Sequence, residues 1–93
     1  MTLVTRADLR QIYNWTPLPH DDPKVSGVPD ATLVDRNEGY EILFLIEATI
    51  GAWGLSTKDD GLKIERLIHK VPPYIRSQAS IINWVCKNWY RLD

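Results

Sequence analysis

The stretch from residue 40 to residue 53, YEILFLIEATIGAW, is the most apolar part of the chain and constrains the fold most. As a helix it would be apolar nearly all round, which is typical of the buried centre of a bundle. Asp35 or Asn37 would cap its start, and Gly54 would end it. Its main core-facing residues would be Tyr40, Leu43, Phe44, Ile46, Ile50 and Trp53.

A β-hairpin is the alternative structure for the same region. Residues 31–34 and 40–46 would then be strands joined by the turn DRNEG. Periodicity alone does not separate a short apolar strand from a buried helix. We favour the helix because the apolar pattern continues to Trp53, beyond the length of a typical strand.

A first helix is predicted over residues 5–15. Thr5 is a good N-cap, and Asp8 stands at the third helical position, where its carboxylate favours the positive helix end. Leu9, Ile12 and Tyr13 then share one face. The proline at position 17 ends the pattern.

Two more helices are predicted over residues 56–71 and 79–91. Ser56 or Thr57 caps the first of them, and two prolines stop it. Its Gly61 is expected to cost up to about 1 kcal/mol relative to alanine. Ser77 or Ser80 could cap a second start in the last segment, with a break near residue 78.

Residues 16–34, TPLPHDDPKVSGVPDATLV, form a long connection rich in proline. Loops of this length are uncommon inside compact domains. We expect a strap fixed to the core through apolar side chains, and the alternative is a mobile functional segment. The available anchors are Leu18, Val25, Val28 and Leu33.

These segments together predict one domain over residues 1–93. The expected fold is all-α, a small bundle of about four helices with the Pro-rich loop between the first and second. The alternative is an α+β fold with the hairpin at residues 31–46. A content of 44% apolar and 25% charged residues is ordinary for a folded domain.

The chain has one cysteine, Cys86, which excludes an internal disulfide. We expect it to be a buried thiol. The start of the sequence, MTLVTRADLR, has no apolar leader, and no run approaches the roughly 20 apolar residues of a spanning helix. The expected location is the cytoplasm, with no membrane association.

Charge is divided unevenly along the chain. Residues 1–62 carry five basic and ten acidic side chains, whereas residues 63–93 carry six basic and two acidic ones. This basic half suggests nucleic-acid binding as one function, by two helices joined at the double proline. An isoelectric point near 6.1 weighs against a dedicated DNA-binding protein. The candidate contacts are Lys70, Arg76, Lys87 and Arg91.

A protein-interaction module without catalysis is the function that we favour. Tryptophan, tyrosine and arginine are frequent anchors of interfaces. They gather at the end of the chain, where one helix face does not bury them all. The partner is another protein or a second copy of the chain, as in a homodimer. The candidate binding residues are Trp84, Lys87, Trp89, Tyr90 and Arg91.

No motif of a known catalytic or cofactor site is present, so we expect no enzyme, metal or cofactor. His20, Asp21 and Asp22 are polar neighbours, but three consecutive residues do not easily converge on one ion. Glu47, set among apolar residues, is expected at a helix edge or in a buried pair with Arg6, Arg66 or Arg76. Small size and absent motifs are typical of accessory proteins of bacteria and their phages.

Overall fold

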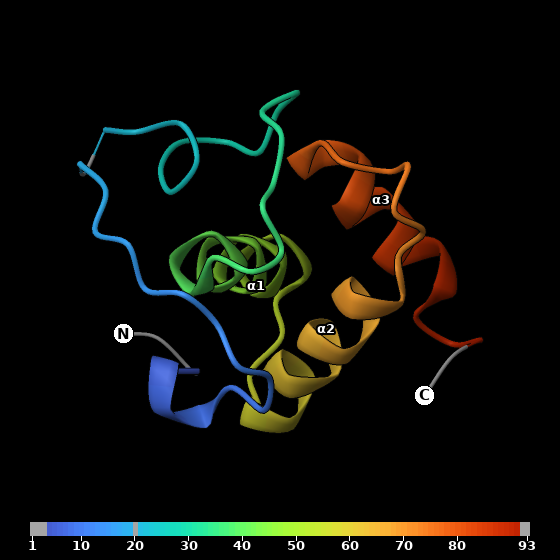
Figure 1. Ribbon diagram of the computed structural model, residues 1–93. Coiled ribbons are helices and arrows are strands. Elements are labelled where there is room, and N and C mark those ends of the chain that lie inside the picture. The colour runs from blue at the N-terminus through green and yellow to red at the C-terminus, as the bar shows by residue number, and fades with distance from the viewer. Residues whose placement is uncertain (1–3, 20, 92–93) are drawn as a thin grey trace.

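Helix α1 (Gly39–Trp53) runs through the middle of the molecule, and the rest of the chain is arranged around it (Figure 1). The computed structural model describes residues 4–19 and 21–91. Helices α2 (Lys58–Lys70) and α3 (Gln78–Asn88) pack on one side, and the 3-10 turn η1 (Arg6–Asp8) lies near the chain start. The described residues hold isolated bridges but no strand, so the all-α prediction is confirmed and the hairpin alternative is wrong.

Helix α1 confirms the central helix and shortens it at its start. Residues 35–37 form a turn instead, in which the Asn37 N–H donates to Asp35 Oδ1 at 2.9 Å. The Asn37 carbonyl accepts from the Asn14 N–H at 2.7 Å. At the other end Gly54 has φ of 65°, the left-handed conformation that glycine adopts without strain, and it ends the helix as predicted.

The predicted helix over residues 5–15 is wrong beyond its first turn. The Thr5 N–H does donate to Asp8 Oδ2 at 2.9 Å, but the chain then becomes extended. The reason is that tertiary acceptors take the N–H groups a helix would use. Glu65 accepts from the N–H groups of Arg10 and Gln11, and Asn14 pairs with the start of α1. Residues 4–19 and 21–91 therefore hold three α-helices where four were predicted.

Helices α2 and α3 confirm the two later predictions, and each has a side-chain cap. Thr57 Oγ1 accepts from the Asp60 N–H at 3.1 Å, and Ser77 Oγ accepts from the Ser80 N–H at 3.2 Å. Helix α2 is shorter than predicted at both ends, whereas α3 begins one residue earlier than predicted and ends three residues earlier. Arg36 binds the end of α2 to the rest of the chain, because its guanidinium donates to the carbonyls of Val71, Pro72 and Ile75.

The core side of α1 differs from the prediction. Ile42, Leu45 and Ile46 are fully buried, and Thr49 lies beside them. Ile46 faces the core as predicted, and Leu43 packs against the core although it is only half-buried. Tyr40 and Phe44 are half-buried as well but line the groove side of the helix. Because α1 is apolar nearly all round, its sequence alone does not show which side its two partner helices cover.

Two predictions about single residues are also corrected. Cys86 is exposed, because the buried positions of α3 are Gln78, Ile81 and Val85, and the next residue after Val85 turns away from that stripe. Glu47 is exposed too, so its predicted buried pair is wrong and its alternative position at a helix edge is the one found. Buried carboxylates in the described residues belong to Glu41 and Glu65. His20 lies outside the described residues. Within the described part of the chain, no helix is long and apolar enough to span a bilayer.

Candidate functional site

An open groove of about 390 Å³ lies between α1 and the Pro-rich strap, which we define as residues 16–34. Four of its lining residues come from α1 and three from the strap. On α1 they stand at intervals of three and four residues, so they form one stripe along the helix. The lining residues are Pro17, Leu18, Val25, Tyr40, Leu43, Phe44 and Glu47.

The groove exists because one side of α1 has no helix packed against it. Helices α2 and α3 cover one side, and the segment predicted to be a helix over residues 5–15 is mostly extended. The strap crosses the remaining side, and Trp15 of the extended N-terminal segment lies beside it against Tyr40 (Figure 1). Phe44 is half-buried but does not pack against the buried core, in contrast to Leu43. Its ring therefore lines the groove and is not part of the packing of the buried core.

The strap is fixed by polar contacts more than by the apolar anchors that the sequence suggested. Leu18 and Val25 are half-buried at the groove, but Val28 and Leu33 are exposed. The carboxamide of Gln78, itself 1% exposed, supplies the main attachment. It donates to the carbonyls of Pro23 and Lys24 and accepts from the Asp30 N–H at 3.2 Å.

The first residues of the strap are attached to α1 as well. The Thr16 hydroxyl donates to Glu38 Oε1 at 3.1 Å, and the Thr16 N–H donates to the other oxygen of the same carboxylate. Together with Gln78, this contact holds the strap at both ends of the groove-lining segment. The two walls of the groove are therefore fixed relative to each other before any partner arrives.

Among the described residues that line the groove, Glu47 is the one with a charged side chain. Its side chain is exposed to solvent, but partial burial beside the apolar walls raises the pKa of its carboxyl. Burial in a less polar environment disfavours the ionised form. The predicted pairing with Arg6 or Arg76 is not found. Arg6 contacts Trp15 and Tyr40 instead, and Arg76 lines a separate depression.

One rim of the groove is held by aromatic contacts. The Arg6 guanidinium carbon lies 4.4 Å from the centroid of the Trp15 ring, and its Nη1 donates to the Tyr40 hydroxyl at 3.3 Å. Trp15 in turn meets Tyr40 edge to face, with centroids 5.1 Å apart. A Cβ on Gly39 would lie 2.5 Å from the Trp15 ring, so this glycine leaves room for the indole.

The five residues predicted to bind a partner fall into two groups. Trp84 and Trp89 are half-buried against the core. Trp89 meets Trp53 edge to face at 5.3 Å, and Lys63 Nζ lies 4.4 Å from its ring centroid. Lys87, Tyr90 and Arg91 are exposed at the end of α3.

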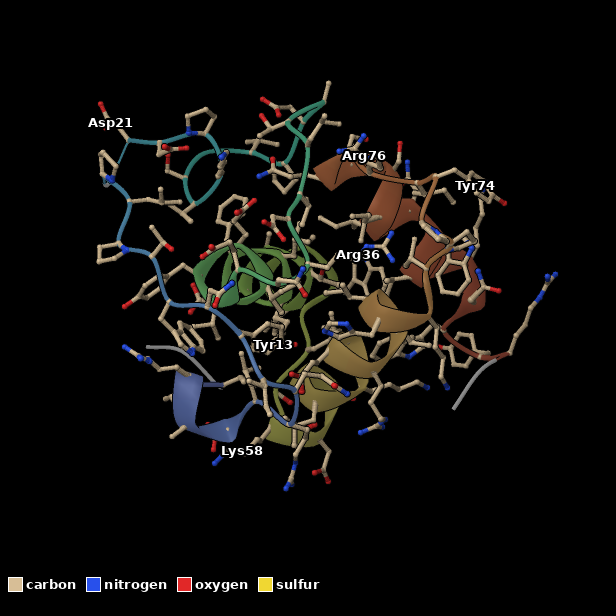
Figure 2. All side chains as sticks on the ribbon, in the orientation of Figure 1. Tyr13, Asp21, Arg36, Lys58, Tyr74 and Arg76 are labelled. Atoms are coloured by element: carbon tan, nitrogen blue, oxygen red, sulfur yellow. The ribbon has the colours of Figure 1, made fainter. Side chains whose placement is uncertain are left out.

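Of the four cations predicted to contact nucleic acid, three lie near the two ends of α3 and one lies at the end of α2. Arg76 is exposed just before this helix (Figure 2), whereas Lys87 and Arg91 are exposed at its far end. Lys70 is exposed at the end of α2. The start of α3 is occupied by the strap, since the backbone N–H groups of Gln78 and of the following alanine donate to strap carbonyls at 2.9 Å.

A buried polar cluster joins α2 to the extended N-terminal segment, and sequence reasoning missed it. The Tyr13 hydroxyl lies 2.6 Å from Glu65 Oε2 and 2.7 Å from His69 Nε2. Tyr13 has one proton, which it donates to the carboxylate, so His69 Nε2 carries the hydrogen of the second bond. Burial, followed by the hydrogen bond to Glu65, raises the pKa of Tyr13. The available signal was Glu65 itself, which falls on the apolar stripe of α2.

The groove was missed as well, although the sequence contained two signals of it. Residues 40–53 are apolar on more sides than two neighbouring helices cover, and Glu47 interrupts them on one side. No known protein family, curated protein or solved structure matches this chain. The groove and its surroundings are therefore the basis for assigning a function.

Proposed function

We propose that this chain is a protein-interaction module that binds a segment of another protein in the groove between α1 and the strap. The observation that carries the proposal is the outer stripe of α1, whose apolar residues are covered by a loop with an open groove beneath it. Binding grooves are mostly apolar, with a few polar groups that fix the orientation of the ligand. Six non-acidic lining residues and Glu47 match that description.

Preformed walls support the proposal further. A site that is already ordered loses less conformational freedom when it binds, so more of the contact energy appears as affinity. Here Gln78 and Glu38 hold the strap, and Arg6 and Trp15 hold Tyr40. Phe44 contributes an aromatic surface that the core does not use.

Site-directed photo-crosslinking tests the proposal. A photoreactive phenylalanine analogue is placed at Phe44 or at Leu18, and the purified variants are irradiated in an extract of the cells that make the protein. Matched controls carry it at Asp59 or Asn83, which are exposed on other helices. We expect a discrete crosslinked protein from the groove positions and not from the controls. Equal labelling from all four positions, or none from any, would contradict the proposal.

A fifth position separates the groove from the C-terminal surface that the sequence suggested. The analogue replaces Tyr90, which is 95% exposed beside Lys87 and Arg91. Crosslinking from Tyr90 alone would place the interface at the end of α3 and refute the groove. Crosslinking from Phe44 alone supports the groove as the binding site.

A further inference from the structure

The charges around the groove indicate what kind of segment it binds. Glu47 is acidic, and no lysine or arginine is among the described residues that line the groove. Burial raises the pKa of the Glu47 carboxyl and outweighs the opposing effect of the positive charge of the chain's N-terminus. Of the nearby cations, Arg6 is stacked on Trp15 and hydrogen-bonded to Tyr40 at the rim. Lys24 lines a separate depression together with Glu41. The groove therefore offers apolar walls and one negative charge to an incoming partner.

The size of the groove limits the conformation of that partner. A helix is about 10 Å wide with its side chains and rises 5.4 Å per turn, so a single turn fills roughly 400 Å³. The groove measures about 390 Å³. A bound helix would have to leave most of its length outside, whereas an extended segment places alternate side chains into a narrow space.

We propose that the groove binds an extended peptide segment with an apolar side chain followed two residues later by lysine or arginine. This inference rests on the proposed function. Leu43 and Glu47 are four residues apart on α1, which is about 6 Å along the helix axis. Side chains two residues apart in an extended chain are separated by about 6.6 Å on the same face. The apolar side chain lies against Leu43 and Phe44 while the cation meets Glu47.

A second copy of the chain is the competing occupant, because Tyr74 and Arg76 are exposed and have the same spacing. Figure 2 shows Tyr74 on the opposite side of the molecule from the strap residue Asp21, whereas Arg76 lies closer to the strap and lines a depression with Lys24 and Leu33. A contact between two such different surfaces is not the self-complementary interface of a two-fold dimer, and it would build a larger ring or an open chain. A segment of another protein is therefore the occupant that we infer.

Selection from a displayed library of random peptides tests the inference. Wild-type protein, Glu47→Gln and Phe44→Ala are used as baits in parallel, after circular dichroism confirms that all three fold. Phe44→Ala spares the buried core, because Phe44 does not pack against it. We expect wild-type protein to enrich peptides with an apolar residue and a base two positions later. Glu47→Gln should enrich the apolar residue without the base.

The outcomes separate the two proposals. Apolar peptides without a base on the wild-type bait would overturn the inference and leave the proposed function standing. No enrichment above the Phe44→Ala bait would overturn both. In a fluorescence anisotropy titration of one selected peptide, Glu47→Gln should weaken binding roughly threefold to fivefold, as for a partly exposed ion pair. Glu47→Lys should regain affinity for the same peptide with its base changed to glutamate.

Light scattering of the protein alone tests the second copy. We expect a monomer at all concentrations. Concentration-dependent growth that is lost in both Glu47→Gln and Arg76→Gln would show that the chain binds its own Tyr74–Arg76 surface, and it would overturn the inference of a foreign segment.

Discussion

Gly51 and Gly61 both lie inside helices, but their surroundings predict opposite effects of the same substitution. A Cβ on Gly51 would meet nothing within 4 Å, whereas one on Gly61 would collide with Val4 Cγ2. Gly51→Ala should stabilise the fold by about 0.5–1 kcal/mol through helix propensity. Gly61→Ala should destabilise it by about 1–3 kcal/mol through overpacking, although propensity alone predicts a gain.

Urea denaturation followed by circular dichroism measures both effects. Each glycine variant serves as the control of the other, because the chemical change is identical. Stabilisation by Gly61→Ala would mean that the close approach of Val4 to α2 does not exist in solution.

The buried carboxylate of Glu65 depends on the Tyr13 hydroxyl for one of its hydrogen bonds. Tyr13→Phe keeps the ring and removes only this donor. Hydrogen bonds to charged groups contribute about 1.5–3 kcal/mol, so the free energy of unfolding should fall by about that amount. Tyr74→Phe, at an exposed tyrosine, is the matched control and should have no effect. Equal stability of the two variants in urea would contradict the buried contact.

His69 makes stability depend on pH near neutrality. Burial lowers the pKa of its imidazole; the Glu65 charge opposes this and the Arg36 charge adds to it. The unfolded chain then binds a proton near the ordinary value of about 6.5, before the folded protein does. The contribution of His69 to the free energy of unfolding is therefore fully present above the unfolded-state pKa of about 6.5. It is lost as the pH falls from that value toward the lower pKa of the folded state.

A comparison with His69→Gln isolates this contribution, because glutamine keeps an N–H donor and does not titrate. Between pH 7.5 and pH 5.5 the wild-type protein should lose more stability in urea than the variant does. Parallel pH profiles would show that His69 is not responsible.

At the scale of elements, Gln78 connects α3 to the strap and so controls one wall of the groove. Gln78→Leu keeps the buried volume but leaves the carbonyls of Pro23 and Lys24 without their donor. Leaving buried polar groups unsatisfied costs about 1–3 kcal/mol. We expect faster hydrogen exchange and faster proteolysis within residues 21–30, with α1 and α2 unchanged.

Asn83→Ala, at an exposed position of the same helix, is the control for this variant. It should leave proteolysis of the strap as in the wild-type protein. If Gln78→Leu also left it unchanged, the strap would be held by contacts other than this carboxamide.

At the scale of the whole molecule, the basic residues do not form one continuous surface. Arg76 precedes α3, and Lys87 and Arg91 follow ten or more residues later at its other end. The strap also covers the start of α3, the part of a recognition helix that meets the bases. We expect no change in the anisotropy of labelled DNA or RNA, single- or double-stranded, in low salt. Binding that weakens steeply with added salt would restore the nucleic-acid alternative.

The sequence by itself determined the helical class and contained the residues that cap or end helices at three places. Capping residues and terminal glycines act within one turn, so Thr57, Ser77 and Gly54 have the same effect wherever the helix packs. The apolar character of residues 40–53 correctly placed α1 at the centre. These features are local, or depend on total apolar content, and both can be read from the chain directly.

Only the tertiary structure decided the rest, because it depends on which distant groups meet. Residues 9–15 are extended since Glu65, more than fifty positions away, binds two of their N–H groups. The groove exists for the same reason: without a helix from that segment, one side of α1 is left to the strap. Because residues 9–15 form no helix, the side of α1 that bears Phe44 and Glu47 is left open as a wall of the groove. The pattern of residues 40–53 does not predict this, because it depends on another segment of the chain.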